Sequence, residues 1–328
     1  MAASQALLLR ALDMVTRPPE AQPELLGAVR ASHFRKISNV MDDDNVVAVG
    51  VSEKRVNNEN AGELTVCFYV KEKLPPSRVE GSRMVPAVIS MPGDRAVFTD
   101  VKQIGELRPE LQIRTKPPLQ SGYSIGHVRI TAGTLGAIVR KDKKYHVLSN
   151  SHVLAMSGKA HVGDEIVYPG PMDGGVAPRD VVARLSHFVA FDTSGALVNR
   201  VDAALAEIDP ALYTKLNLAI WKAVSPRVMG TPKRGMKIAK SGRTTDKTTG
   251  EVVDVNFRFV MKYPGVQGKV GFIDQVYCSR YSDGGDSGAA VVDRATGRIV
   301  GLHFAGADGG SVFNPIRAVR SALGFQFA

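Results

Sequence analysis

The tetrapeptide Gly285-Asp286-Ser287-Gly288 decides the interpretation of this 328-residue chain. It stands between two apolar runs, 272–278 and 289–292, whose composition is typical of β-strands. Glycines around a turn permit backbone angles that other residues resist, so the turn pushes the serine hydroxyl outward. Because a short glycine-rich string is weak evidence for a nucleophile by itself, its meaning depends on the rest of the chain.

Short strand patterns recur on both sides of this tetrapeptide. They are separated by turn residues and occupy 133–140, 145–150, 165–168, 181–187, 203–208, 237–241, 252–260, 272–278, 289–292 and 298–303. This spacing predicts a mainly β architecture, either a sandwich or a pair of barrels. A terminal helix is predicted over 315–323, with proline in its first turn.

The first third of the chain has a different pattern. Apolar residues recur at helical spacing over 6–16 and 22–36, whereas three β-branched and aromatic runs predict a hairpin and a further strand, at 46–51, 64–70 and 97–104. Two prolines and a glycine make 116–122 a predicted linker. We therefore expect a small α+β accessory region over 1–118 and a mainly β domain over 119–328.

Composition narrows the classes of protein. The chain is 44% hydrophobic but lacks the run of about 18 apolar residues that a membrane span needs. Its opening lacks the basic and apolar regions of a secretory signal, which predicts a cytoplasmic protein that is not associated with a membrane. Cys67 and Cys278 lie far apart, which predicts that the protein has no disulfide framework. The cysteines and histidines show no metal-ligand spacing, so we predict no metal and no cofactor.

The net charge of +10 lies mostly beyond Leu119, where 26 of the 42 basic and 17 of the 32 acidic residues are found. It is densest in a basic segment, 233–247, which contains Lys233, Arg234, Lys237, Lys240, Arg243 and Lys247. A solvated strand-and-loop face is the favoured interpretation. No aromatic residues are interleaved for base stacking, so a nucleic acid partner is not expected. The alternative function is a binding module that grips an acidic partner or a nucleic acid with this segment.

A serine hydroxyl attacks efficiently only when an imidazole accepts its proton and a buried carboxylate orients that imidazole. His152 follows a predicted strand in the sequence Leu-Ser-Asn-Ser-His-Val-Leu, at the start of a short helix. Asp202 opens a run of small apolar residues, where a buried carboxylate needs a partner, although a helix cap or turn is its commoner use. His303 is the rival base, but its place within a strand favours packing.

With these residues in view, the second part of the chain resembles the trypsin-like (chymotrypsin-fold) serine proteases, and more narrowly the narrow-leaf-type group of bacterial and plant members. The resemblance rests on seven motifs, at 132–136, 148–154, 162–170, 201–204, 242–245, 285–288 and 301–316. It implies a chymotrypsin-like double β-barrel and an endopeptidase that cleaves protein or peptide substrates through an acyl-enzyme. His152 would be the general base, Asp202 its orienting acid and Ser287 the nucleophile, with oxyanion donors at Gly285 and Ser287.

The resemblance also points to the substrate pocket. The residue six before the nucleophile is Tyr281, followed by Ser282 and Asp283, and Ala305 and Gly306 are the other candidate pocket residues. A trypsin-type preference for lysine or arginine is therefore not supported, although Asp283 remains a candidate partner for a basic side chain.

Activation is the least defined part of the mechanism that the resemblance implies. In zymogen relatives, the aspartate before the nucleophile pairs with a new N-terminus, but no typical activation sequence precedes Ile125 or Ile130 here. The accessory region would inhibit the enzyme, present substrates or bind an activating partner, and in that last case self-cleavage near 116–124 would accompany activation.

Overall fold

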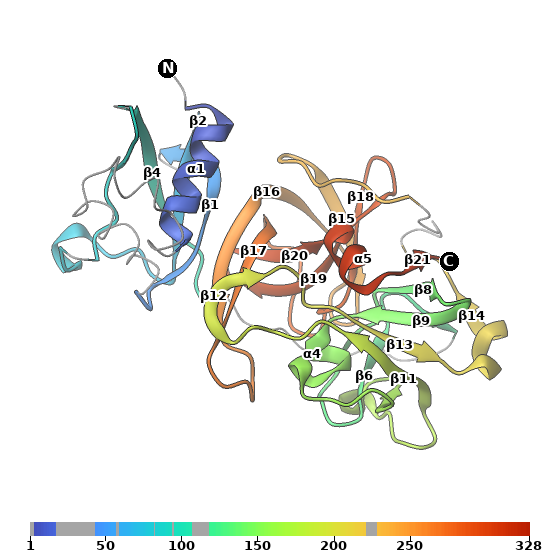
Figure 1. The fold of residues 1–328 in the computed structure, drawn as a ribbon. Helices are drawn as coiled ribbons and strands as arrows, with labels where there is room; N and C mark the ends of the chain where they lie inside the picture. Colours follow the sequence, from blue (N-terminus) through green and yellow to red (C-terminus); the bar gives the residue numbers. More distant parts are fainter. Residues whose placement is uncertain are drawn as a thin grey trace.

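The structure is a computed structural model that describes residues 3–17, 43–56, 59–81, 83–93, 95–106, 118–220 and 228–328. Two β-barrels lie beside a smaller N-terminal unit (Figure 1). No helix among the described residues is long and apolar enough to cross a membrane. The predicted helix at 22–36 lies outside the described residues.

The first barrel is an eight-stranded sheet that returns on itself. Its spatial order is β21-β8-β9-β13-β11-β10-β6-β7. Only residues 135–136 separate β7, at one end of this order, from β8, which lies next to the other end. The strands are β6 (Ser124–His127), β7 (Gly133–Thr134), β8 (Ala137–Lys141), β9 (Lys144–Ser149), β10 (Glu165–Val167), β11 (Val181–Phe188), β13 (Ala204–Ile208) and β21 (Gln326–Phe327).

The second barrel closes through six strands. In the order β17-β20-β19-β18-β15-β16, each strand pairs with the next, and an additional β16–β17 pairing completes the ring. These strands are β15 (Lys237–Gly242), β16 (Asp246–Met261), β17 (Lys269–Cys278), β18 (Ala290–Asp293), β19 (Ile299–Ala307) and β20 (Gly310–Pro315). β12 (Ser194–Asn199) adds to β17 in parallel. The expected chymotrypsin-like double β-barrel is confirmed.

The N-terminal part forms a small unit, here called the accessory unit and comprising the described residues of 3–106. It contains α1 (Gln5–Thr16), β1 (Val46–Val56), β2 (Glu59–Val70), β3 (Val88–Met91) and β4 (Arg95–Gln103). The predicted hairpin is confirmed, because β1 and β2 pair antiparallel. Leu8 and Leu12 of α1 are buried against Phe68 of the sheet, which gives the unit a core of its own.

The accessory unit is joined to the second barrel by a continuous sheet. Ala48 and Val49 of β1 pair with Phe259 and Arg258 of β16, which extends the sheet to eleven strands. A shared cluster of buried side chains crosses this junction and includes Ala48, Tyr69, Phe257, Phe259 and Phe304. The division at residue 118 stays a prediction about function, since packing crosses between the two parts.

Several other sequence predictions can be compared with this structure. The helix predicted over 315–323 is α5 (Ile316–Leu323), with Pro315 at its N-cap. The linker prediction is wrong for Leu119 and Gln120, which form β5 and pair with β14 (Leu216–Asn217). The remaining helices among the described residues are α4 (Ser151–Leu154) and four short 3₁₀ turns, at Pro76–Arg78, Met156–Gly158, Pro171–Asp173 and Pro210–Lys215.

Cys67 and Cys278 are free and buried, one in the accessory unit and one in the second barrel. Burial raises the pKa of the Cys67 thiol to about 12 and also raises that of Cys278. Both side chains are therefore uncharged core residues at neutral pH.

Candidate active site

The structure brings His152 and Asp202 into direct contact. His152 lies in the one-turn helix α4, directly after β9, and Asp202 lies just before β13, which pairs with β9. The Asp202 carboxylate is fully buried and lies 2.5 Å from Nδ1 of His152, and it also accepts the backbone N–H of His152 at 3.2 Å. Since a carboxylate only accepts, this contact places the imidazole proton on Nδ1 and leaves the Nε2 lone pair available.

Three further side chains hold Asp202 in place. Tyr263 donates its hydroxyl to the same carboxylate oxygen at 2.9 Å. Asn314 accepts the Asp202 backbone N–H at 2.9 Å, and Asn150 donates to the Asp202 carbonyl at 2.7 Å. Burial, together with the Asp202 charge, raises the pKa of Tyr263, which keeps its hydroxyl protonated as a donor. Asp202 is thus fixed from both barrels.

Sequence reasoning missed these three supporting residues. Asn314 stands in an Asn-Pro motif that is part of the resemblance, but the motif did not indicate what Asn314 does. Asn150 likewise stands in the motif at 148–154, again without a role. Tyr263 gave no signal, because it acts through a contact with Asp202 that is distant in sequence.

Ser287 lies in the loop between β17 and β18. The loop requires glycine, because Gly285 and Gly288 both adopt φ of +96°, a left-handed conformation that side chains resist. A Cβ at Gly288 would also come within 2.1 Å of Ser149 Oγ and 2.3 Å of the Thr134 carbonyl oxygen. This close approach sets the serine loop directly against the first barrel.

Thr134 of the first barrel anchors this loop. Its backbone N–H donates to the Ser287 carbonyl at 2.7 Å, and its hydroxyl donates to the Gly285 carbonyl at 2.7 Å. Ser149, which directly precedes the helix that carries His152, donates its hydroxyl to the Thr134 carbonyl at 2.7 Å. The serine loop and the histidine helix are therefore tied to the same edge of the first barrel.

The Ser287 hydroxyl makes one weak contact in this structure. It donates to the Phe304 carbonyl of β19 at 3.4 Å and forms no hydrogen bond with His152 within the described part of the chain. The backbone N–H groups of Gly285 and Ser287 likewise have no acceptor among the described residues. These two amides are thus available to a ligand oxygen, as an oxyanion site requires.

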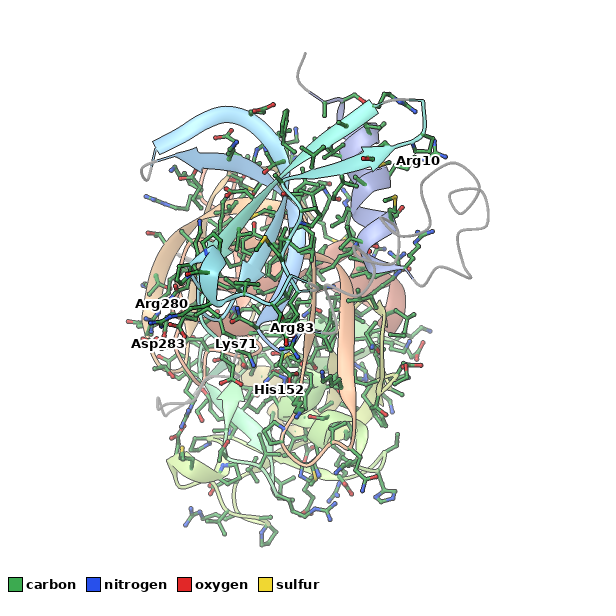
Figure 2. All side chains as sticks on the ribbon, turned by 90° about the vertical axis from the view of Figure 1, so that its left-hand side faces the viewer. Arg10, Lys71, Arg83, His152, Arg280 and Asp283 are labelled. Carbon is green, nitrogen blue, oxygen red and sulfur yellow. The ribbon has the colours of Figure 1, made fainter. Side chains whose placement is uncertain are left out.

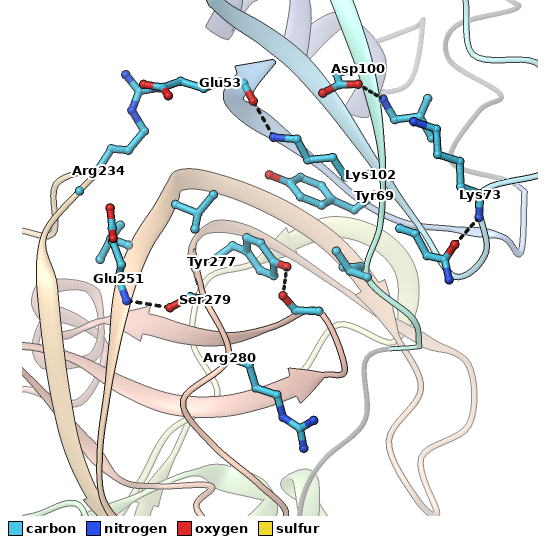
Figure 3. Close-up of a pocket in the computed structure, with 17 residues that line it drawn as sticks. Glu53, Tyr69, Lys73, Asp100, Lys102, Arg234, Glu251, Tyr277, Ser279 and Arg280 are labelled. Carbon is cyan, nitrogen blue, oxygen red and sulfur yellow. Dashed lines mark hydrogen bonds between the residues drawn. The ribbon is translucent and has the colours of Figure 1, made fainter. Parts of the chain in front are cut away.

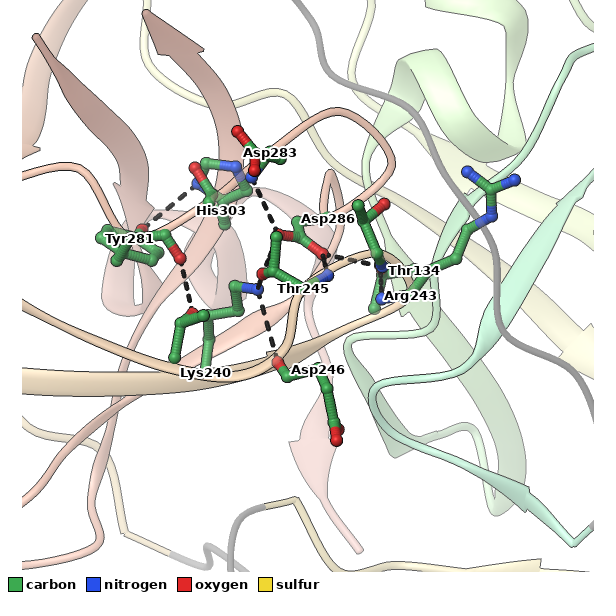
Figure 4. Close-up of polar contacts among 12 residues, drawn as sticks. Thr134, Lys240, Arg243, Thr245, Asp246, Tyr281, Asp283, Asp286 and His303 are labelled. Atoms are coloured by element: carbon green, nitrogen blue, oxygen red, sulfur yellow. Dashed lines mark hydrogen bonds and ion pairs between the residues drawn. The ribbon is translucent and has the colours of Figure 1, made fainter. Parts of the chain in front are cut away.

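Asp286, directly before Ser287, forms a buried ion pair with Lys240 of β15 (Figure 4). The Lys240 ammonium lies 2.6 Å from the carboxylate, and both side chains are fully buried. Asp286 also accepts from the Thr245 hydroxyl at 2.6 Å and from the backbone N–H of Thr244 and Asp283, both at 3.0 Å. Burial alone would raise the pKa of Asp286, but Lys240 and these hydrogen bonds lower it below its ordinary value.

His303 of β19 has a different environment. Its Nδ1 lies 3.2 Å from the Tyr281 hydroxyl, and burial lowers the pKa of its imidazole to about 3. The ring is therefore neutral throughout the physiological range and serves the packing that its strand position predicts.

The candidate pocket residues differ in their burial. Tyr281 and Ser282 are almost completely buried, and Ser282 shares a 2.6 Å hydroxyl contact with Ser311. Asp283 is half exposed and forms an ion pair with Arg280. Ala305 and Gly306 are buried in β19. Figure 2 shows Arg280 and Asp283 together at the left edge of the molecule, and His152 nearer its middle, below the accessory unit.

The basic segment 233–247 is not entirely the solvated face that its charge predicts. Lys240 and Arg243 are fully buried and do not belong to a solvated face. Arg243 forms two hydrogen bonds, of 2.6 and 2.7 Å, with the buried carboxylate of Asp173. The two cations were misplaced because a charge count carries no information about burial, and each has its own buried counter-ion.

Within the described ranges, no three histidine, cysteine or acidic side chains gather where they could hold a metal ion.

The double β-barrel is the fold of a class of peptide-bond hydrolases. The family model of the trypsin-like peptidase domain matches residues 133–302, and the chain belongs to this family. The comparison does not distinguish the narrow-leaf-type group within it. No curated protein matches the chain.

Several solved bacterial-type protease structures are similar to part of the chain. A glutamic acid specific serine protease, described as using a histidine triad in substrate binding, is 18% identical, with 64% of this chain and 100% of that chain covered and a TM-score of 0.46. Protease A of Thermobifida fusca is 17% identical, with 64% and 97% covered and a TM-score of 0.44. The chymotrypsin of Cellulomonas bogoriensis is 14% identical, with 64% and 97% covered and a TM-score of 0.42.

Proposed function

We propose that this trypsin-like peptidase is a serine endopeptidase in which Ser287 attacks the peptide carbonyl, His152 accepts its proton and Asp202 orients the imidazole. The observation that carries the proposal is the buried His152–Asp202 contact, which leaves Nε2 of the imidazole as a base. The low pKa of His303 supports His152 over its rival, since a ring with a pKa of about 3 is a poor base at neutral pH.

In the proposed reaction, the Ser287 hydroxyl leaves its weak contact with Phe304 and transfers its proton to His152 as Oγ bonds to the substrate carbonyl carbon. The negative charge that forms on the carbonyl oxygen is stabilised by the N–H groups of Gly285 and Ser287. His152 then donates the proton to the leaving amine, and an acyl-enzyme remains on Ser287. Water attacks this ester with His152 again as base, which releases the acid product and restores the hydroxyl.

We also propose that the enzyme needs no cleavage for activation. In zymogen relatives a new N-terminus pairs with the aspartate before the nucleophile, whereas here Lys240 supplies the cation to Asp286 within the uncut chain. The contacts from Thr244, Thr245 and Asp283 hold the same carboxylate. The loop that carries Ser287 is therefore formed without self-cleavage near 116–124.

Specificity is assigned to the residues beside this loop, Tyr281, Ser282, Asp283, Ala305 and Gly306. Asp283 is paired with Arg280, so a basic substrate side chain would have to compete for its carboxylate. The binding-module alternative is not favoured, because Lys240 and Arg243, two of the six cations in the basic segment, are fully buried. The cytoplasmic location and the protein or peptide partners stay predictions.

A peptide library cleaved by the wild-type protein and by Ser287→Ala tests the proposed function. We expect cleavage by the wild type, with a preference at the residue before the cut, and a loss of about 10⁴-fold or more in Ser287→Ala. Asp202→Asn, which keeps the shape but disturbs the histidine tautomer, should lose about 10⁴-fold. Undiminished cleavage by Ser287→Ala would overturn the assignment.

A further inference from the structure

A cavity of about 830 Å³ lies between the accessory unit and the second barrel (Figure 3). One wall comes from the accessory unit and carries Tyr69 of β2, Lys73 after the end of β2, and Lys102 of β4. The opposite wall comes from the second barrel and carries Arg234, Tyr277 and Arg280. The cavity lies outside the candidate active site, and the proposed peptidase mechanism gives it no role.

The tyrosines at the base of this cavity differ in their hydrogen bonding. Tyr277 donates its hydroxyl to the Gly309 carbonyl at 2.7 Å. The ring of Tyr69 packs 5.1 Å from that of Tyr277, but its buried hydroxyl has no hydrogen-bond partner within the described part of the chain. Because a buried hydroxyl is costly to leave unpaired, Tyr69 is suited to a polar ligand atom inside the cavity.

Positive charge predominates among the unpaired groups that line the cavity. No carboxylate of the described residues lies within ion-pair distance of Lys73, Lys102 or Arg234. Lys102 donates to Ser52 Oγ at 2.8 Å and to the Glu53 carbonyl at 2.7 Å, which leaves one of its three N–H donors free.

The lining carboxylates are less available than these cations. Glu251 is paired with Lys237, and Asp100 accepts the N–H of Val101 at 2.8 Å. Glu53 remains as the local counter-charge. Because these three cations have no ion-pair partner among the described residues, the cavity favours an anionic ligand, and a carboxylate matches both the lysine and arginine donors.

We propose that this cavity binds a carboxylate-bearing ligand, either the acidic side chains of a peptide segment or a free di-acid, through Tyr69, Lys102 and Arg234. The ligand would accept the Tyr69 hydroxyl and the free Lys102 donor at the base, while Arg234 closes over it from the exposed rim of the barrel. This site is a property of the junction, because neither unit alone supplies both walls.

Contacts connect this site to the serine loop. Arg280 lines the cavity and forms an ion pair with Asp283. The Asp283 backbone N–H donates to the Asp286 carboxylate at 3.0 Å, and Asp286 directly precedes Ser287. A carboxylate that competes for Arg280 would therefore alter the loop, and the ligand would regulate the peptidase. This regulatory step rests on the proposed function, whereas binding itself does not.

Calorimetry on the full-length Ser287→Ala protein tests binding without cleavage of the probe. The probes are a capped hexapeptide that alternates glycine and glutamate, its glutamine counterpart, and free glutarate. We expect saturable binding of the glutamate peptide or of glutarate, and the stronger of the two identifies the source of the carboxylate. In the same background, Tyr69→Phe and Arg234→Gln should each weaken that binding about tenfold, because each loses a hydrogen bond to a charged group.

Two matched changes control for general effects. Arg317→Gln removes one exposed arginine of α5, and Tyr145→Phe removes a hydroxyl in the first barrel, so both should leave binding unchanged. Equal binding to all variants, equal binding of the glutamine peptide, or binding of no probe would overturn the site. In the wild type, the ligand should change the rate of fluorophosphonate labelling about fivefold. An unchanged rate beside normal binding would overturn only the regulatory step.

Discussion

The two barrels differ in how the edges of their sheets are covered. The first barrel uses its own chain, since β7 leads directly into β8 and β21 covers the outer edge of β8. The second barrel closes through β16 and β17, but the same β16 also extends into the accessory unit through β1. This difference indicates that the accessory unit is part of the packing of the second barrel. The first barrel supplies His152, Asp202 and the Thr134 anchor independently of the accessory unit.

Removal of the accessory unit should have the largest effect. A chain that begins at Pro118 would expose Phe257, Phe259 and Tyr277, at a cost of about 2 kcal/mol each. The total, about 6 kcal/mol, is comparable to the stability of a whole domain. We expect the shortened chain to lose cooperative thermal unfolding by calorimetry and circular dichroism.

A single substitution tests the packing at the same junction without deletion of the accessory unit. Ala48 is fully buried at the β1–β16 pairing, so Ala48→Arg should lower the melting temperature markedly, whereas Ala96→Arg on the exposed face of β4 should not. A shortened chain that unfolds cooperatively and labels at Ser287 would show instead that the second barrel is independent.

Lys240→Met should have the next largest effect. It leaves the buried Asp286 carboxylate without its cation, which typically costs about 3–5 kcal/mol. Activity should fall with stability, because the same carboxylate holds the serine loop. Lys237→Met is the matched control on the same strand, since its exposed pair with Glu251 is worth at most about 1 kcal/mol. Urea unfolding of both variants measures the difference, and equal losses would contradict a special role for Lys240.

Asp254 of β16, beside the junction with β1, makes the stability of the protein depend on pH. Burial raises the pKa of its carboxyl to about 7, and a Cβ at Gly50 of β1 would lie 1.9 Å from its Oδ2. Between the unfolded pKa, about 4, and the folded pKa, the folded state holds one proton more than the unfolded state, so stability falls as pH rises through this window. The loss levels off above pH 7, at no more than about 4 kcal/mol.

Asp254→Asn should remove this pH-dependent loss. Stability measured by urea unfolding at pH 5 and pH 8 should decline less in Asp254→Asn than in the wild type. Asp308→Asn, at an exposed position of the second barrel, should follow the wild type. An identical decline in all three proteins would show that Asp254 does not titrate in this window.

Tyr263→Phe should have the smallest effect. It removes one hydroxyl that donates to Asp202, which is worth about 1.4 kcal/mol for a bond to a charged group and corresponds to about tenfold in the rate. Tyr168→Phe, which loses a 3.0 Å hydrogen bond to the Pro118 carbonyl in the first barrel, serves as the control. Steady-state kinetics on a library-derived peptide would separate the two, and equal rates would exclude a positioning role for Tyr263.

The sequence predicted most strands because β-branched and aromatic runs alternate with turn residues. It missed β20, whose sequence Gly-Ser-Val-Phe-Asn-Pro contains a glycine and a proline that usually indicate turns. It also missed β12, which lies in a polar stretch and depends on its pairing with β17. These strands are fixed by neighbours that are distant in sequence, and local patterns carry little information about such pairing.

The candidate site shows the same limit. Ser287, His152 and Asp202 could be predicted as site residues because a nucleophile, a base and an acid have local surroundings typical of their chemistry. Lys240 was misplaced, although strand alternation offered a signal, because Ile238 and Lys240 share one face of β15 and Ile238 is buried. A buried Asp286 carboxylate requires a nearby cation, and the inward face of β15 is one place where the sequence could supply that cation.

Fluorophosphonate labelling of the intact chain tests the central claim most directly. The protein should first be confirmed by mass spectrometry to be uncut, then labelled at neutral pH and digested to locate the adduct. The account predicts a single adduct on Ser287 in the uncut chain, none in Ser287→Ala, and a strongly reduced rate in Asp202→Asn. Folded, uncut protein that does not label, or that labels only after cleavage near residues 116–124, would contradict it.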